Sequence, residues 1–321
     1  MNNASSLLKA CEFFKDSLKA CDICPRKCLA DRSSGRAGYC RAPYNPVVYS
    51  YMPHRGEEPP ISGRRGSGAI FFSHCNMKCA YCQNYSFSQL DKGNETSIDR
   101  LAEMMLSLEN SGCHNINLVS PTHFVPRIIS ALQLAFDKGL NIPIAYNTGG
   151  YERVETIRAL SGIVDIYMPD MRYSSNEMAE RYSDAPGYVD YDRPAVAEMH
   201  RQVGDLVMDK NGIAKRGLII RLLALPQAIS GTEDSLRYIK EKISKNTYIS
   251  LMSQYYPTFK ASNYKELSRG VNRDEYKNVV DACRVLGLNN GWIQEMSEEP
   301  DDKFLGANIK QKDLKNDAQN T

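Results

Sequence analysis

The chain has 321 residues and almost balanced charge, with 40 Lys and Arg residues against 38 Asp and Glu residues. This balance gives no indication of a nucleic-acid or membrane partner. The sequence has no signal-peptide pattern and no apolar run of the roughly 18 residues that a membrane helix needs. We therefore expect a cytoplasmic protein with one large domain and a small appendage.

The N-terminal part of the chain, residues 1–65, is predicted to be the appendage. Apolar residues at helical spacing predict an amphipathic helix over 4–20. After it come four cysteines in the pattern C-x2-C-x3-C-x11-C, and the stretch around them is too poor in apolar residues to build a core of its own. We expect it to fold around zinc or a second iron–sulfur cluster, in a closed structural site. The ligands would be Cys21, Cys24, Cys28 and Cys40.

Residues 41–67 are rich in Pro, Gly and charged residues, and we interpret them as a connector. The apolar run 68–72 after them predicts a buried strand. Eight of the ten cysteines lie between positions 11 and 82 at spacings typical of metal ligands, which favours a reducing compartment over disulfides.

A second cysteine pattern, C-x3-C-x2-C, follows the strand at 68–72 and consists of Cys75, Cys79 and Cys82. A [4Fe–4S] cluster normally takes four thiolates, so three cysteines leave one iron open. Three ligands without a nearby fourth suit tetrahedral zinc poorly. The pattern therefore predicts a [4Fe–4S] cluster with one free coordination position, at the end of a buried strand.

Strands and helices alternate over residues 66–296, as in βα units around parallel strands. Predicted helices include 97–110, a long helical region over about 175–208, and 273–286. The tail 297–321 has few apolar residues and is predicted to be mobile. The six predicted strands are 68–72, 115–119, 142–146, 163–168, 217–223 and 247–252.

Residues just past the carboxyl ends of parallel strands converge, so they form a candidate pocket over the cysteine loop. Arg221 lies inside an apolar strand, where a buried arginine needs an anionic partner, either a ligand or a protein carboxylate. Asp170 and Arg172 could instead form a surface pair or cap the following helix. The strand-end candidates are Ser120, Thr122, His123, Asn147, Asp170, Arg172, Arg221 and Gln254.

The cysteine loop, with Tyr81 just before its last cysteine, resembles the signature of the radical S-adenosylmethionine (SAM) superfamily. The resemblance implies an α/β fold with a partial (β/α)6 barrel. It also implies that the open iron binds SAM and that reduction cleaves SAM to a 5'-deoxyadenosyl radical. Three motifs resemble a group related to pyruvate formate-lyase activating enzyme: Cys-x-x-Cys-Pro-Arg-x-Cys at 21–28, Cys-Gln-Asn at 82–84 and Gly-Trp-Ile-Gln at 291–294.

The resemblance also implies roles for the strand-end residues. Activating enzymes carry Gly-Gly-Glu after the second strand to receive the SAM amino group, whereas this chain carries Ser-Pro-Thr-His at 120–123. Ser120 and Thr122 can still accept a hydrogen bond from an ammonium, and the role of His123 stays open. Arg172 and Arg221 would hold the SAM carboxylate. Tyr81, Asn147, Asp170 and Gln254 complete the expected cofactor site.

Three functions follow from these patterns. The first is a radical SAM enzyme that abstracts hydrogen from a partner protein, in the manner of a glycyl-radical activating enzyme. The second keeps this chemistry for a small molecule or a peptide side chain. The third is a non-enzymatic iron–sulfur electron carrier or zinc-stabilised module. The first two also imply a reducing protein such as flavodoxin or ferredoxin.

Overall fold

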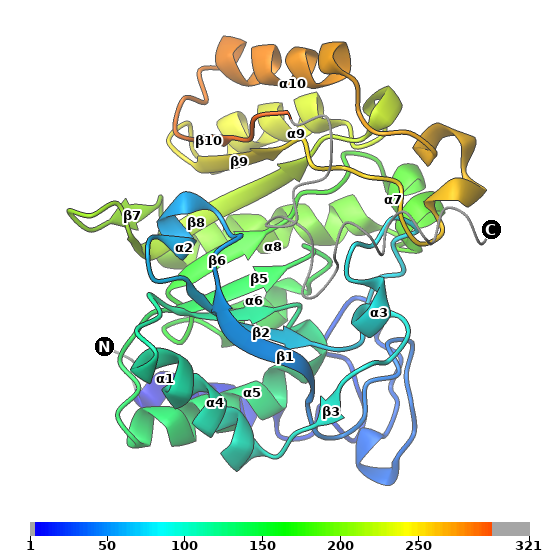
Figure 1. Cartoon of the computed structure of the whole chain (residues 1–321). Coiled ribbons are helices and arrows are strands. Elements are labelled where there is room, and N and C mark those ends of the chain that lie inside the picture. The colour runs from blue at the N-terminus through cyan, green and yellow to red at the C-terminus, as the bar shows by residue number, and fades with distance from the viewer. Residues whose placement is uncertain (1–3, 297–321) are drawn as a thin grey trace.

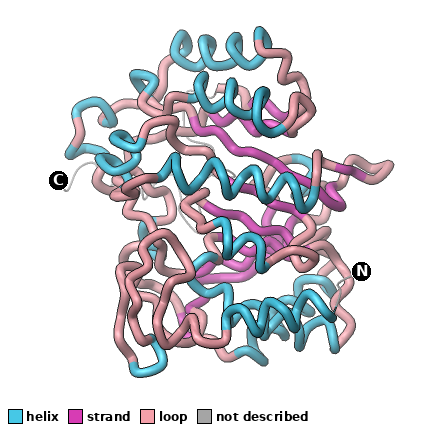
Figure 2. The backbone as a smooth tube through the Cα atoms, turned by 180° about the vertical axis from the view of Figure 1, so that it is seen from behind, coloured by secondary structure: helices cyan, strands magenta, loops and turns pink. Residues whose placement is uncertain are grey.

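The computed structural model describes residues 4–296, and these residues form a curved sheet with helices along one face (Figures 1 and 2). The predicted tail 297–321 lies outside the described residues. Within them, no helix is long and apolar enough to cross a lipid bilayer.

All six predicted strands are present and parallel, and neighbours in the sheet follow chain order. Their residues are almost all buried, and strands buried on both faces have the nearly continuous apolar runs seen in the sequence. The α/β fold with a parallel sheet is therefore confirmed. The strands are β2 (Ser67–Phe72), β4 (Ile116–Val119), β5 (Ile144–Thr148), β6 (Ile166–Pro169), β8 (Ala214–Leu223) and β9 (Tyr248–Met252).

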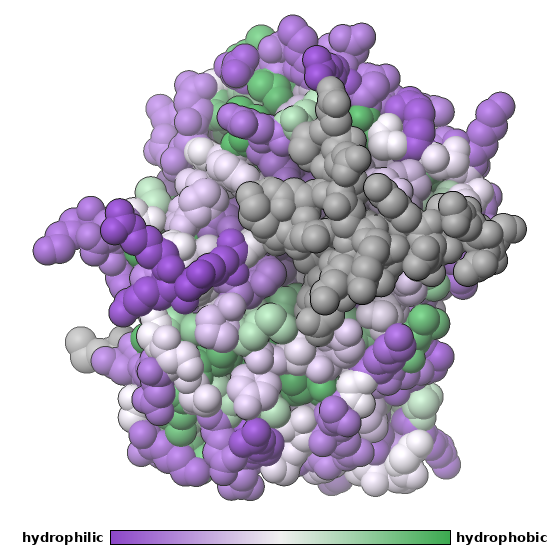
Figure 3. Space-filling model, viewed as in Figure 1, coloured by the Kyte–Doolittle hydropathy of each residue, from purple (hydrophilic) through white to green (hydrophobic). Residues whose placement is uncertain are grey.

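Four further strands extend the sheet. β10 (Gly291–Ile293) adds a seventh parallel strand beside β9, whereas β1 (Val47–His54) runs antiparallel to β2. The interpretation of residues 41–67 as a connector was therefore wrong for 47–54. Two-residue strands β3 (Asn94–Glu95) and β7 (Val207–Met208) pair antiparallel with β1 and β8. The turn after β7 projects from the molecule with hydrophilic side chains (Figure 3).

The helices fill the connections between parallel strands. The predicted helix over 4–20 ends earlier, and the predicted helical region 175–208 is two helices, separated where Asp184 and Gly187 take left-handed backbone conformations. The main helices are α1 (Ala4–Phe14), α4 (Ile98–Asn110), α5 (Val125–Asp137), α6 (Val154–Ala159), α7 (Asn176–Ser183), α8 (Tyr188–Val203), α9 (Thr232–Tyr238) and α10 (Arg273–Val285). The one-turn helices α2 (Pro59–Ser62) and α3 (Tyr85–Ser88) flank β2 and its loop.

Side chains along each strand alternate between two faces of the sheet. One face packs against the helices, and the other faces the inside of the curved sheet. Ile220 and Leu222 of β8 belong to the large apolar core shared with the helices, whereas Arg221 and Leu223 line a cavity on the other face. Successive side chains of a strand point to opposite faces, so the apolar neighbours of Arg221 bring its guanidinium into the interior.

Candidate functional site

The cysteine loop leaves the carboxyl end of β2, where His74 takes a left-handed backbone conformation with φ 69°. Two amides of the loop, at Lys78 and Ala80, donate to the carbonyls of Ser183 and Tyr182 at 2.9 and 2.8 Å. The loop is therefore anchored to the carboxyl end of α7, across the mouth of the curved sheet.

Each of the three loop sulfurs has a hydrogen-bond donor nearby. The Met77 amide lies 3.4 Å from Cys75 Sγ, the Ser88 hydroxyl 3.2 Å from Cys82 Sγ, and Arg172 Nη1 3.9 Å from Cys79 Sγ. Hydrogen bonds to ligand sulfurs stabilise and tune iron–sulfur clusters. The loop thus offers three thiols from one short segment, with donors suited to hold them as thiolates.

Proton affinity in this loop is high while the thiols are free. Burial, followed by the neighbouring Cys79 and Cys82, raises the pKa of Cys75 to about 12. A metal must therefore displace protons from these sulfurs, and binding releases them. As the side chains are placed, no three His, Cys, Asp or Glu side chains within 4–296 are arranged to hold a metal ion, so both cysteine ligand sets stay predictions from spacing.

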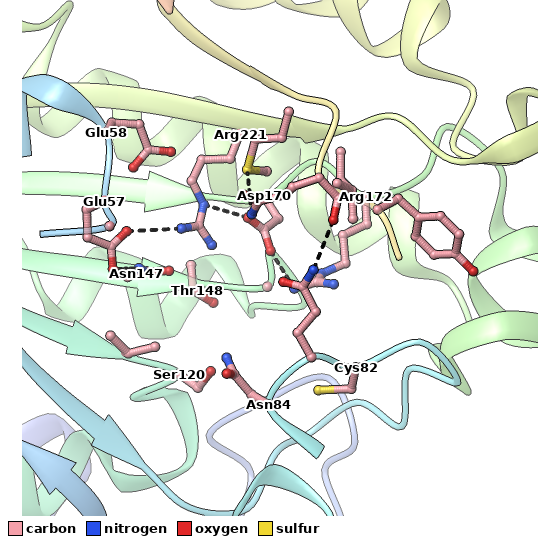
Figure 4. Close-up of a pocket in the computed structure, with 18 of the residues that line it drawn as sticks. Glu57, Glu58, Cys82, Asn84, Ser120, Asn147, Thr148, Asp170, Arg172 and Arg221 are labelled. Atoms are coloured by element: carbon pink, nitrogen blue, oxygen red, sulfur yellow. Dashed lines mark hydrogen bonds and ion pairs between the residues drawn. The ribbon is translucent and has the colours of Figure 1, made fainter. Parts of the chain in front are cut away.

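Beside the loop lies a cavity of about 160 Å³, lined from the strand ends (Figure 4). It brings together residues from all seven parallel strands or the turns after them, which supports the expectation that these ends converge. Of the residues predicted to bind a cofactor or metal, those that line it are Tyr81, Cys82, Ser120, Asn147, Asp170, Arg172, Arg221 and Gln254.

Charge inside the cavity is organised around Asp170. Its Oδ1 accepts from Arg221 Nε at 2.7 Å, and its Oδ2 accepts from Arg172. Arg221 also reaches Glu57 Oε2 at 3.5 Å. Arg221 therefore has its anionic partners within the protein, and its burial does not by itself require a bound carboxylate. Asp170 and Arg172 do pair with each other, but inside the cavity and not on the surface, as the alternative interpretation had it.

Thr122 and His123 do not line the cavity. The Thr122 hydroxyl donates to Glu152 Oε1 at 2.5 Å, and His123 Nε2 lies 2.7 Å from the Ser73 carbonyl. Burial lowers the pKa of His123 to about 3, so the ring is neutral and its Nε2 donates to that carbonyl. Both side chains link neighbouring strand ends.

The N-terminal cysteines form a separate group, apart from the cysteine loop. Cys21, Cys24 and Cys40 are buried and Cys28 is exposed. Burial is the main reason that the pKa of Cys24 is raised, and the neighbouring Cys40 and Cys21 raise it further. Cys21, Cys24 and Cys40 thus lie close enough to one another to raise each other's pKa.

The N-terminal segment is fixed to α6 and to the cysteine loop. Asp22 Oδ2 accepts from Arg153 Nη1 at 2.6 Å, and the Thr156 hydroxyl donates to the Ile23 carbonyl at the same distance. Arg26 Nε donates to the Asn76 carbonyl at 3.0 Å, and its guanidinium stacks on Tyr39 at 3.6 Å. The segment therefore packs directly against the loop that carries the other cysteines.

Sequence reasoning missed two acidic residues of the cavity, Glu57 and Glu58. They lie between β1 and α2, in the stretch interpreted as a connector. One signal in the sequence could have pointed to them: the acidic pair stands directly before Pro59 and Pro60. Pro is common in the first turn of a helix, so a short helix beginning there would hold the two preceding side chains in a fixed direction. Asn84 and Trp292 also line the cavity.

Comparison with known proteins supports the assignment suggested by the cysteine loop. Residues 69–189 match the model of the Radical SAM superfamily. Over 286 residues, the chain is 28% identical to the uncharacterized protein MJ0674 of Methanocaldococcus jannaschii, covering 87% of this chain and 78% of that protein.

Among solved structures, the FeFe-hydrogenase maturase HydG from Carboxydothermus hydrogenoformans is 12% identical, with 70% of this chain and 52% of that chain covered and a TM-score of 0.46. SuiB of Streptococcus suis bound to SAM is 12% identical, with 72% and 52% covered and a TM-score of 0.48. This chain thus spans about half the length of each. The residues that match the Radical SAM superfamily model, 69–189, contain the three-cysteine loop.

Proposed function

We propose that the protein binds a [4Fe–4S] cluster through Cys75, Cys79 and Cys82, cleaves SAM reductively in the adjoining cavity and abstracts hydrogen from a partner protein. The observation that carries this proposal is the three-cysteine loop at the carboxyl end of β2, whose last cysteine, Cys82, lines a charged cavity. When bound, the cluster and SAM would supply a 5'-deoxyadenosyl radical. The protein itself has to orient and shield.

The chain's own residues suit both tasks. Tyr81 and Tyr255 are buried and in edge-to-face contact, with ring centroids 5.6 Å apart, and both line the cavity beside Cys82. They would keep water from a reactive site. Arg172, fixed by Asp170, faces Cys79 and can hold an anionic group of SAM near the cluster loop.

A small molecule is the second candidate substrate, and one observation favours it: the cavity extends to the buried acidic pair Glu57 and Glu58, which a large partner could reach only with an inserted side chain. An electron carrier without catalysis would leave the charged cavity without a use. Either enzymatic function needs a one-electron reductant, for which a flavodoxin or ferredoxin is our proposed partner.

The test is anaerobic reconstitution with iron and sulfide, followed by reduction and assay for 5'-deoxyadenosine and methionine. The wild-type protein should form both from SAM, and Cys79→Ala should form neither. Cys11→Ala is the matched control, since Cys11 lies on α1 outside both cysteine patterns, and it should retain cleavage. Absence of 5'-deoxyadenosine from reduced, cluster-loaded wild-type protein would refute the proposal.

A further inference from the structure

The segment between β1 and α2 closes the cavity from the end opposite the cysteine loop. His54, the last residue of β1, pairs with Ser67, the first residue of β2, so the segment begins at the amino end of the parallel strands. Cys75 follows the carboxyl end of β2. Figure 4 accordingly shows Glu57 and Glu58 on one side of the cavity and Cys82 on the other. We call the side with Glu57 and Glu58 the acidic end of the cavity.

Glu57 is fully engaged with the protein. Its Oε1 accepts from Asn117 Nδ2 at 2.9 Å and from Asn147 Nδ2 at 3.4 Å, while Oε2 faces Arg221 Nη1 at 3.5 Å. Arg221 in turn is shared between Glu57 and Asp170. Glu57 and Asp170 are therefore both matched to side chains of the protein.

Glu58 is different. Its side chain lines the cavity and the residue is only 3% exposed, yet its Oε2 atom is buried and has no hydrogen-bond partner among residues 4–296. Burial raises the pKa of Glu58 most, Arg221 lowers it, Glu57 raises it, and the nearby hydroxyl of Ser250 lowers it as a donor. Arg221 is closest to the other two carboxylates, so Glu58 is an acceptor in excess. A buried acceptor without a partner is costly, and a ligand that donates to it removes that cost.

We propose that Glu58 binds the cationic head of the substrate, and that the substrate is therefore an alkylammonium compound. This rests on the proposed function: the resemblance implies that SAM binds the open iron at the cysteine loop, and Glu58 and Cys82 lie on different sides of the cavity (Figure 4). Apolar side chains that also line the cavity suit the alkyl part. They are Val119, Leu223, Met252 and Trp292.

Proton release offers a signature of this contact. Burial has the largest effect on the pKa of Glu58 and raises it. Arg221 lowers this pKa and Glu57 raises it, each by less than burial does. Burial, and after it the charge of Glu58, raises the pKa of the nearby Tyr248. An ammonium beside Oε2 favours the carboxylate, so binding of the cation should expel a proton where Glu58 is protonated in the free protein.

The experiment is isothermal titration calorimetry on cluster-loaded protein with SAM present, using n-butylammonium as the probe and n-butanol and butyrate as charge controls. Butylammonium should bind more tightly than either control, and Glu58→Gln should weaken it at least tenfold. Glu58→Asp, which keeps the charge, should retain part of the affinity. Glu241→Gln, at an exposed glutamate, should bind like the wild type. Titrations in buffers of different ionisation enthalpy should reveal proton release that Glu58→Gln lacks.

The affinity for SAM separates this inference from the alternatives. It should be unchanged in Glu58→Gln, and a parallel loss would show that Glu58 holds the cofactor instead. Equal binding of butylammonium and butanol to the wild type would overturn the inference even if Glu58→Gln failed to fold. If wild-type protein cleaves SAM but does not prefer the cation, only this inference fails. If it does not cleave SAM, the proposed function fails on its own.

Discussion

Replacing Glu152 with Gln should remove one step of the pH dependence of folding stability. Glu152 follows β5 and is completely buried, and its Oε1 accepts from the hydroxyls of Thr122 and Thr148, both at 2.5 Å. Its Oε2 has no hydrogen-bond partner within the described part of the chain. Gln keeps the accepting oxygen and nearly the same volume but does not ionise between pH 5 and 9.

The magnitude follows from the pKa of this carboxyl. Burial raises the pKa of Glu152 from 4.5 to about 7, although three hydroxyl donors act in the opposite direction. The folded state thus binds more protons than the unfolded state between these values, and stability is lost as pH rises through the window. Integrated from pH 5 to pH 8.5, at about 1.36 kcal/mol per pKa unit, the loss from Glu152 is about 2.5 kcal/mol.

Anaerobic urea unfolding of cluster-loaded protein at several pH values measures this loss. The free energy of unfolding of the wild type, minus that of Glu152→Gln, should fall by about 2.5 kcal/mol between pH 5 and pH 8.5. Glu241→Gln is the control at an exposed site and should run parallel to the wild type. Parallel curves for Glu152→Gln as well would refute the reasoning, because they would mean that Glu152 is ionised in the folded protein at pH 5.

Two further predictions concern the cysteine sites. Cys28→Ala should lower metal content and thermal stability while some SAM cleavage survives, because a metal-folded segment loses its organising centre without the ion; loss of all cleavage with the loop cluster still loaded would make this site an electron relay. Arg172→Met should make the reduction potential of the loop cluster more negative, by tens of millivolts in an electrochemical titration. A charge 4 Å away is worth about 4 kcal/mol at an effective dielectric constant of about 20, and Asp170 offsets part of it. Arg181→Met, at an exposed arginine, should leave the potential unchanged.

The parallel strands were predictable because burial on both faces gives them apolar runs that hold over their whole length. The strand predicted at 217–223 is β8, Ala214–Leu223, and that at 247–252 is β9, Tyr248–Met252. β1 was missed because it is only partly buried and contains Pro53, so its composition resembled a connector. β10 has three residues, too few for a periodic signal.

The strand-end rule predicted most of the cavity, because parallel strands bring their carboxyl ends to one edge whatever the loops do. It could not identify Glu57 or Glu58, which come from the amino end. The contact of Glu57 with Asn117 spans 60 residues of sequence, and no local pattern encodes it. The rule also included Thr122 and His123, whose side chains follow a strand but turn into the protein because the chain twists sharply at Ser120, with φ 56°.

The attachment of the N-terminal segment also sets an order of events during synthesis. Asp22, Ile23 and Arg26 contact residues that are 131, 133 and 158 positions later in the chain. At about 5–20 residues per second, the ribosome needs roughly 8–30 s to make the last of these partners after Arg26 has been added. Throughout that interval the four N-terminal cysteines have no barrel to pack against. If these cysteines bind a metal as predicted, it would bind a segment that is still independent, and the rest of the fold would receive that segment already folded around its ion.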